Sequence, residues 1–354
     1  MSCTATDTRR VPSPSSRPAT DAPTTRSPEV VQGLTSRARR VVAGIALAGL
    51  AGLGSVLTSL RAVPRAQELP GAGLVASFAA YGLVVWMLVA ALGGVVLRGR
   101  RRVVAVGVAL ALAAWHAAWI APYYRADDRP LTGPRVTILS VNVLGGAADP
   151  DALTRAAQGA DVVVLLEYDR STEAALAGRG WAERFPYHVG RVGAWAEGSV
   201  IFARRPLRLV RTLPTQFGTY LAVVDPGQAS SFGLLAGHPV NPPISRTGWL
   251  REARLMTDEA ATYAGARLVV IGDLNSTPDH VTIRRMRDEA GLRDAADEAG
   301  AGWLRTYPAD RAYVPALLGL DQTLLRGEVY AESVETVRVP GSDHLGIRAV
   351  LRLG

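Results

Sequence analysis

The chain has 354 residues, which favours two structural units at roughly 100 to 200 residues per domain. All 39 of its basic residues are arginine, which excludes a lysine Schiff base or a lysine nucleophile. The single cysteine, Cys3, excludes an intrachain disulfide and a cysteine-based zinc cluster.

The net charge of +8 belongs to the first part of the chain. Residues 1–135 hold 16 arginines against 6 acidic residues, whereas residues 136–354 hold 23 arginines against 25 acidic residues. The second part therefore lacks the basic excess that would attract a nucleic acid over long range. The near-neutral net charge of this part does not exclude local clusters of arginine.

The N-terminal third predicts a disordered tail followed by three transmembrane helices. Residues 1–40 combine proline, serine, threonine and arginine with few large apolar side chains, a composition that does not form a core. Three stretches without any charged residue follow, each long enough to span a bilayer. Buried helices of a soluble domain are the alternative, which would require three long helices that are apolar on every face. Within residues 41–120, the predicted spans are 41–60, 74–97 and 103–120.

Arginines flanking the spans predict the orientation of the chain. Three arginines lie within residues 37–40 and four within residues 98–102, whereas the loop after the first span has only Arg61 and Arg65. Cytoplasmic loops carry the arginine excess. We therefore expect a multi-pass protein of the cell membrane with a cytoplasmic N-terminus and with everything after residue 120 outside the cytoplasm.

After a polar linker at residues 121–135, the pattern changes to short β-rich runs alternating with amphipathic segments. This pattern predicts an α+β domain of mixed sheets over residues 136–354. Thr277 and Pro278 suit the start of the last predicted helix, as N-cap and first-turn proline. The predicted strands are 136–143, 161–167, 199–203, 220–224, 231–237, 267–272, 320–325 and 344–353, and the predicted helices are 149–159, 172–178, 246–263 and 279–290.

Polar residues follow the apolar strands at the points where the strands end. Strand ends that share one edge of a sandwich converge, so these residues predict a polar, carboxylate-rich site on a rigid support. Each residue alone also has an ordinary interpretation as a turn cap, a solvated acid or a loop-packing side chain. The segment GDLNSTP, followed by Pro278, is more specific, because it places an acid and an amide beside a helix N-terminus, which suits a phosphate. The residues are Asn142, Glu167, His238, Asp273, Asn275, Asp343 and His344.

Seven segments, in this order and spacing, resemble the endonuclease/exonuclease/phosphatase superfamily of metal-dependent phosphoesterases, which includes the DNase I-like nucleases. The segments are SVNV, LLEYD, GSVIFARRP, GHPVNP, GDLNSTP, LDQTLL and GSDHLGI, within about residues 134–354. The resemblance implies a four-layer α/β/β/α sandwich and hydrolysis by in-line attack of water at phosphorus, without a covalent enzyme intermediate.

The resemblance also implies roles for single residues. Glu167 would bind Mg²⁺ or Mn²⁺, with Asn142 near it and Asp343 assisting, since such hard cations prefer oxygen ligands. Asp273 would orient or deprotonate the attacking water, and Asn275 would hold that water or a phosphate oxygen. The remaining roles fall to His238 and His344, which would contact non-bridging phosphate oxygens, and to Asp321, which would pair with His344 and favour its protonated form.

One position departs from the family pattern. Where the family often has Asp-His, this chain has Asp321-Gln322. The carboxylate is kept, so we expect the change to affect packing more than chemistry.

The motifs indicate the type of reaction more clearly than they indicate the substrate. Three spans before a phosphoesterase domain, an arginine-only and alanine-rich composition and the GHPVNP segment resemble actinobacterial VanJ-type teicoplanin-resistance proteins, which implies a lipid-linked pyrophosphate such as undecaprenyl pyrophosphate. The alternative is an extracellular DNase I-like nuclease, with nucleic acid as substrate only. An inactive sensor or binding module on a membrane anchor is the third hypothesis.

Overall fold

The computed structural model describes residues 28–129 and 131–354, with side chains from residue 37 onward. Residues 1–27 of the predicted tail therefore lie outside the described residues. The chain divides into two units after Ala46. The contacts discussed below all lie within the second unit, Leu47–Gly354.

Three helical segments are long and apolar enough to cross a membrane, as the sequence predicts. They are Arg37–Ala62, Ala79–Val96 and Gly99–Tyr124, with mean hydropathies of 2.0, 2.1 and 2.0. The helices that contain them are α1 (Pro28–Ala62), α3 (Gly82–Val96) and α4 (Gly99–Ile120), the last continuing into η3 (Ala121–Tyr124). Helix α1 begins before the apolar stretch at residue 41, because helical backbone hydrogen bonds do not require apolar side chains.

The second span is shorter than the predicted range of 74–97. Residues 72–78 leave the helix axis: after Gly71, whose φ is +75°, the chain forms the short helix α2 (Ala72–Ala76) and then η2 (Ala79–Tyr81) before α3 begins. The apolar residues Leu74 and Phe78 are therefore not part of the span. Hydropathy did not distinguish them, because they are as apolar as the helix that follows.

A polar cluster connects the three spans. The Oγ1 of Thr58 in α1 accepts a hydrogen bond from the indole N–H of Trp86 in α3 (2.8 Å) and lies 3.0 Å from Nε2 of His116 in α4. A Cβ at Gly82 would lie 2.2 Å from the His116 ring. His116 is fully buried, and these contacts place it in the packing between the three helices.

Two six-stranded mixed sheets form the C-terminal domain. The first has the order β11-β12-β1-β2-β4-β3 and the second the order β5-β6-β7-β8-β10-β9. Strands β1 and β2, and β7 and β8, pair in parallel, and the other pairs are antiparallel. The bounds are β1 Arg135–Asn142, β2 Val162–Leu166, β3 Tyr187–Arg191, β4 Ser199–Ala203, β5 Leu207–Leu213, β6 Thr219–Val224, β7 Phe232–Ala236, β8 Arg267–Asp273, β9 Arg293–Asp294, β10 Asp321–Gly327, β11 Val329–Val337 and β12 Gly346–Leu353.

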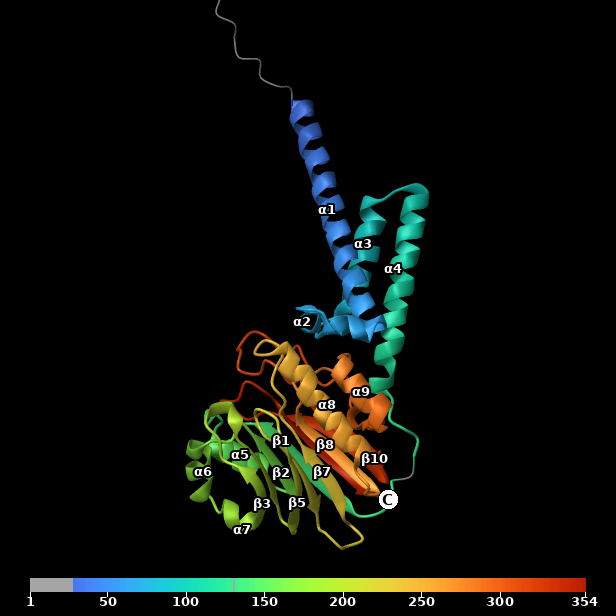
Figure 1. The fold of residues 1–354 in the computed structure, drawn as a ribbon. Helices are drawn as coiled ribbons and strands as arrows, with labels where there is room; N and C mark the ends of the chain where they lie inside the picture. Colours follow the sequence, from blue (N-terminus) through green and yellow to red (C-terminus); the bar gives the residue numbers. More distant parts are fainter. Residues whose placement is uncertain (1–27, 130) are drawn as a thin grey trace, which may run out of the picture. The chain divides into compact units, whose positions relative to one another are not determined.

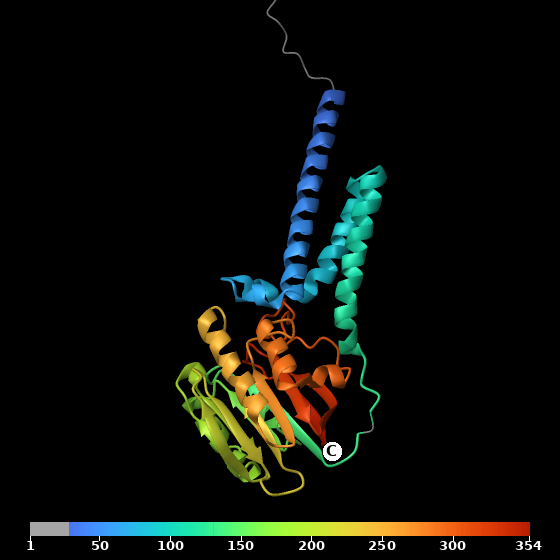
Figure 2. The same ribbon diagram turned by 45° about the vertical axis from the view of Figure 1, so that its right-hand side comes forward.

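The two sheets face each other with helices on their outer sides, as Figures 1 and 2 show. One apolar core lies between the sheets, a second lies between the first sheet and α5 to α7, and a third lies between the second sheet and α8 and α9. This arrangement confirms the predicted four-layer α/β/β/α sandwich. The helices are α5 Pro150–Ala156, α6 Arg170–Ala177, α7 Trp181–Arg184, α8 Arg246–Thr262, α9 Val281–Ala290 and α10 Ala295–Glu298, with the 3-10 turn η4 at Trp195–Glu197.

The eight predicted strands all form, but the sequence analysis missed β3, β5, β9 and β11. Strand β5 is exposed along most of its length and β9 has two residues, so neither shows an apolar run. The predicted cap of α9 was wrong. Helix α9 begins at Val281 with His280 at the N-cap position, where its side chain makes no cap hydrogen bond. The ring Nδ1 of His280 instead accepts the backbone N–H of Thr277 (2.7 Å), so residues 277–280 form a turn before the helix.

Residues 63–81 connect helix α1 to helix α3 and dock on the C-terminal domain. This connection is called here the interspan segment, and its last turn, η2, also begins the second apolar stretch. Gln67, in η1 (Pro64–Glu68), is fully buried. Its amide donates to the carbonyls of Leu60 (2.9 Å) and Asp279 (3.0 Å) and accepts the N–H of Val281 (2.8 Å). Beside it, Arg61 and Asp279 form a buried ion pair of 3.0 Å. The interspan segment is therefore held against the loop that follows β8.

We expect Gln67→Leu to lower the stability of the protein by about 2–3 kcal/mol. The substitution keeps the side-chain size but leaves the buried N–H of Val281 and two carbonyls without their partner. Thermal unfolding in detergent measures the effect. Arg65→Ala, an exposed change in the same turn, serves as the control. Equal unfolding temperatures for Gln67→Leu and the parent would contradict the docking described here.

A buried histidine makes this docking sensitive to acid. His280 is fully buried, and its Nε2 lies 2.9 Å from the carbonyl of Gly73 in α2. Burial lowers the pKa of His280 from 6.5 to about 4, although the Gly73 carbonyl acts in the opposite direction. The unfolded chain binds a proton below about pH 6.5 and the folded chain only near pH 4, so stability is lost as the pH falls between these values.

We expect this loss to reach about 3 kcal/mol at pH 4, from about 1.4 kcal/mol per pKa unit. Unfolding temperatures measured between pH 7 and pH 4 give the effect. His280→Gln keeps one acceptor and one donor but has no proton to bind in this range, so its unfolding temperature should fall less steeply with pH. Parallel curves for the two proteins would exclude His280 as the cause.

Candidate active site

The predicted polar residues meet at one edge of the sandwich. Parallel strands β1 and β2 end there, as do β7 and β8, while the antiparallel strands β10 and β12 begin there. Asn142, Glu167, His238 and Asp273 thus come from strand ends, and Asp321 and His344 from strand starts. The sheet directions place groups from six segments around one point.

An imidazole lies between two carboxylates at the centre of this edge. Asp273 and Asp321 are directly opposite each other in the β8–β10 ladder. The Nδ1 of His344 lies 2.8 Å from Oδ2 of Asp321, and its Nε2 lies 3.5 Å from Oδ2 of Asp273. Both carboxylates and the imidazole are buried. The cationic ring compensates two acids that would otherwise repel each other.

Asp273, Asp321 and His344 are called here the triad, and the charges of His344 and Asp273 follow from its geometry. Burial by itself would lower the pKa of His344, but the carboxylates of Asp273 and Asp321 outweigh burial and raise the pKa to about 10. Burial also opposes ionisation of Asp273, yet His344, His238 and hydrogen bonds from the backbone N–H of Asn275 and the amide of Asn142 lower its pKa. At neutral pH His344 is therefore an imidazolium and Asp273 a carboxylate.

Glu167 lies on the other side of the same point. Its Oε1 accepts a hydrogen bond from the amide of Asn142 (2.9 Å), which also lies 3.3 Å from Asp273. The amide oxygen of Asn142 accepts the N–H of Leu144 (3.0 Å) and so fixes the orientation of the amide. The Nε2 of His238 lies 4.0 Å from Glu167 and 3.7 Å from Asp273.

Two of these residues have a left-handed backbone that is uncommon for residues other than glycine. The φ of Glu167 is 55° and that of Asn275 is 47°. Such strain persists where the surrounding structure enforces it, and it clusters at functional sites. At Asn275 the turn is held by its N–H to Asp273 Oδ1 (3.0 Å) and by its amide to the carbonyl of Pro239 (2.9 Å).

The site opens into a cavity of about 440 Å³. Its polar floor is formed by Glu167, His238, Asp273, Asn275, Asp343 and His344. Asn142 and Asp321 do not line the cavity but contact Glu167 and His344, which do. The ring of Phe217 packs on His238 and that of Tyr307 on His344, each with centroids 4.9 Å apart. Within the described residues, no arginine lines the cavity.

The donor set at the floor fits a divalent cation beside Glu167. Asp343 has a buried Oδ1 without a hydrogen-bond partner among the described residues, and burial raises the pKa of its carboxyl group. Asp273, Asp321 and His344 also bring ligand atoms within 4.8 Å of one another. An imidazolium has no free lone pair for a metal, however. Glu167, which Asn142 orients, and Asp343 are the other carboxylates that line the same cavity and could hold a cation there.

Several residues of the cavity escaped sequence analysis. Phe217 lies in the loop between β5 and β6 and Tyr307 in the loop between α10 and β10, and neither belongs to a recognisable motif. Leu74, Ser77 and Phe78 line the cavity from the interspan segment, although the sequence predicts that they lie within a membrane span. No local pattern connects residues 74–78 with cavity residues that lie about 90 to 270 positions further along the chain.

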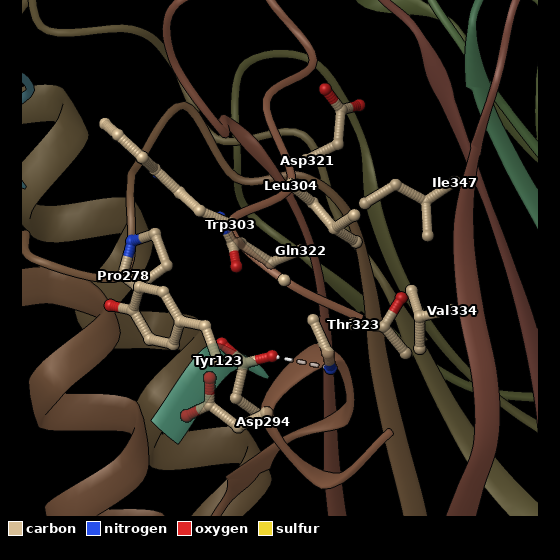
Figure 3. A pocket seen from close by; sticks show the side chains of 13 residues that line it. Tyr123, Pro278, Asp294, Trp303, Leu304, Asp321, Gln322, Thr323, Val334 and Ile347 are labelled. Carbon is tan, nitrogen blue, oxygen red and sulfur yellow. Dashed lines mark hydrogen bonds between the residues drawn. The ribbon is translucent and has the colours of Figure 1, made fainter. Parts of the chain in front are cut away.

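Gln322, the departure from the family pattern, lies apart from the floor of the site. Its amide donates to the carbonyls of Gly319 (2.7 Å) and Ser276 (3.1 Å). Figure 3 shows it at a small, separate cavity with Tyr123 and Asp294, while the carboxyl group of the adjacent Asp321 points away from them. Adjacent strand residues face opposite sides. Gln322 therefore supports the loop after β8.

Comparison with known proteins identifies a family and a fold. The sequence model of the Endonuclease/Exonuclease/phosphatase family matches residues 139–344. No curated protein matches the sequence. Among solved structures, a humanised TDP2 from D. rerio is 18% identical with a TM-score of 0.50, covering 62% of this chain and 99% of its own.

Two bacterial structures are also similar. An endonuclease/exonuclease/phosphatase from Beutenbergia cavernae is 21% identical with a TM-score of 0.47, covering 62% of this chain and 72% of its own. Sphingomyelinase C from Streptomyces griseocarneus is 16% identical with a TM-score of 0.43, covering 61% and 99%. Of the three, the TDP2 structure, with a TM-score of 0.50 and 18% identity, indicates a shared fold and not a shared substrate.

Proposed function

Because the chain belongs to the endonuclease/exonuclease/phosphatase family, we propose that it is a membrane-anchored, metal-dependent hydrolase of phosphoric esters or anhydrides. The observation that supports this most directly is the imidazolium of His344 held between Asp321 and Asp273, with Glu167 at the same cavity. One pocket thus contains a carboxylate that can act as a base (Asp273), a cationic hydrogen-bond donor (His344) and a carboxylate that can bind a metal (Glu167).

Each group has a role in attack of water at phosphorus. Asp273, ionised at neutral pH, accepts a proton from the water, and Asn275 positions the water or a phosphate oxygen. The Nε2–H of His344 lies 3.5 Å from Asp273, longer than a good hydrogen bond, so it is available to a non-bridging phosphate oxygen. His238 donates from the other side, and Asp321 holds the His344 ring.

A divalent cation, Mg²⁺ or Mn²⁺, would be held by Glu167 and Asp343 and would supply positive charge against the phosphate oxygens. No serine nucleophile is required. The hydroxyls of Ser199 and Ser342 donate to the carbonyls of Phe217 (2.9 Å) and Asn142 (2.7 Å), which gives both a structural role.

We further propose that the site lies outside the cytoplasm and acts on a lipid-linked pyrophosphate. With three crossings, the interspan segment and the C-terminal domain lie on the same side of the membrane, which agrees with their contacts. The arginine distribution favours the outer side. A reporter enzyme fused to the C-terminus tests this, and reporter activity in the cytoplasm would contradict it.

A substrate panel tests the activity. Purified protein in detergent with Mg²⁺ should release inorganic phosphate from a prenyl pyrophosphate, and EDTA should abolish the release. Plasmid nicking without phosphate release would instead favour the nuclease alternative. If neither reaction occurs with Mg²⁺ or Mn²⁺, the hydrolase proposal fails and a binding or sensor role is favoured.

A further inference from the structure

The interspan segment forms part of the active-site wall. Of the residues that line the 440 Å³ cavity, Leu74, Ser77 and Phe78 come from residues before the C-terminal domain. The Nε2 of His280 lies 2.9 Å from the carbonyl of Gly73 and 3.3 Å from Oγ of Ser77, so the loop after β8 holds α2 in place. The hydroxyl of Tyr81 donates to the carbonyl of Leu317, at the other end of the segment (2.9 Å).

The cavity has two chemically different parts. Its floor carries the acids and imidazoles of the site, and most of its other lining residues, called here the rim, are apolar, with Ser77 and Asn241 as polar exceptions. Three large apolar side chains at the rim are exposed to solvent: Leu74 by 45%, Phe78 by 41% and Ile244 by 59%. Leu74 and Phe78 come from the interspan segment, and Ile244 comes from the loop before α8. Exposed apolar side chains gathered from distant segments mark a binding surface.

The position of the rim along the chain indicates what it binds. Phe78 directly precedes Ala79, where the second membrane span begins. The rim therefore continues from the catalytic floor to a membrane-spanning helix. A nucleic acid would instead require cationic side chains along its backbone, and among the described residues none of the cavity-lining residues is an arginine.

We propose that Leu74, Phe78 and Ile244 form an apolar lip that selects substrates carrying a hydrocarbon chain on the phosphate. The floor binds the phosphate groups, and the lip contacts the first part of the chain where it leaves the pocket toward the membrane. The inference rests on the proposed hydrolase activity and adds to it the residues that determine specificity. A segment of the membrane anchor thus belongs to the substrate site.

Two substrates that share one headgroup test the lip. A long-chain prenyl pyrophosphate in mixed micelles and the five-carbon isopentenyl pyrophosphate offer the same reacting bond and differ in the chain. We measure kcat/KM for both and take their ratio. The parent protein should prefer the long chain, and the double variant Leu74→Ser/Phe78→Ser should lower the ratio roughly tenfold, as expected for lost apolar contact.

Two further variants keep the result interpretable. Ile244→Ser changes the opposite side of the lip at an exposed loop position and should lower the ratio in the same direction. Val75→Ser is the matched control: Val75 is on the same helix and 38% exposed but does not line the cavity, so the ratio should stay within about twofold.

The outcomes separate the two proposals. If the parent hydrolyses both pyrophosphates with equal kcat/KM, or if the ratio is unchanged in Leu74→Ser/Phe78→Ser and in Ile244→Ser, the lip inference is wrong and the hydrolase proposal stands. If the parent hydrolyses neither pyrophosphate, the lip inference is wrong, and the hydrolase proposal fails with it only if plasmid DNA is not cleaved either. Hydrolysis of plasmid DNA in preference to the long-chain pyrophosphate would also overturn the lip.

Discussion

Replacing His344 with alanine is expected to lower kcat by about 10²- to 10³-fold. The imidazolium is the one cation of the triad, and preorganised donors aimed at developing charge have effects of this size. The carboxylates of Asp273 and Asp321 keep the ring of His344 protonated, because they raise its pKa to about 10. The measurement is phosphate release from the best substrate of the panel at saturating substrate and Mg²⁺.

Controls distinguish chemistry from folding in this experiment. His188→Ala removes an exposed histidine in β3 and should leave kcat unchanged. His344→Gln retains a side chain of similar size between Asp273 and Asp321 but has no positive charge, so it should resemble His344→Ala in kcat. Unfolding temperatures of all three variants report on the fold. A His344→Gln protein with parental kcat would show that the charge is not used.

Glu167→Gln is expected to weaken divalent-metal binding by about 10- to 100-fold, with a corresponding rise in the Mg²⁺ concentration required for activity. The substitution removes the negative charge and keeps the side-chain length beside Asn142. Changes around a metal ligand typically have effects of at least this size. Electron paramagnetic resonance of Mn²⁺ measures binding directly, without reference to turnover.

The matched control for this change lies six residues further along the chain. Glu173→Gln alters an exposed glutamate in α6 and should leave Mn²⁺ affinity unchanged. Equal Mn²⁺ affinity in Glu167→Gln and the parent would show that the cation binds elsewhere on the cavity floor. Asp343→Asn would then be the next variant, because its buried oxygen lacks a partner among the described residues.

Local patterns were sufficient for the α+β class, for eight of the twelve strands and for the polar residues at the strand ends. Buried strands such as β1, β2 and β8 are continuous apolar runs, so both their existence and the polar residues at their ends can be found from sequence. The three spans are likewise evident from hydropathy. Strand β5 was missed because a largely exposed strand carries no apolar run.

The boundary of the second span shows where local patterns fail. Leu74 and Phe78 have the hydropathy of a membrane helix, yet they belong to a wall of the cavity. What separates them from α3 is the docking of the interspan segment through Gln67, Asp279 and His280. The partners in that docking are about 200 residues apart, so no sequence window contains both.

The sequence by itself determined the α+β domain of mixed sheets, the apolar spans and the kinds of side chain at the strand ends, because these depend on periodicity and composition within short segments. The four-layer sandwich followed from the family resemblance of the motifs. Only the tertiary structure decided which nitrogen of His344 faces Asp321 and which faces Asp273, and that part of the membrane anchor lines the site. Such features depend on contacts between distant segments, and those contacts exist only once both sheets and the interspan segment have packed together.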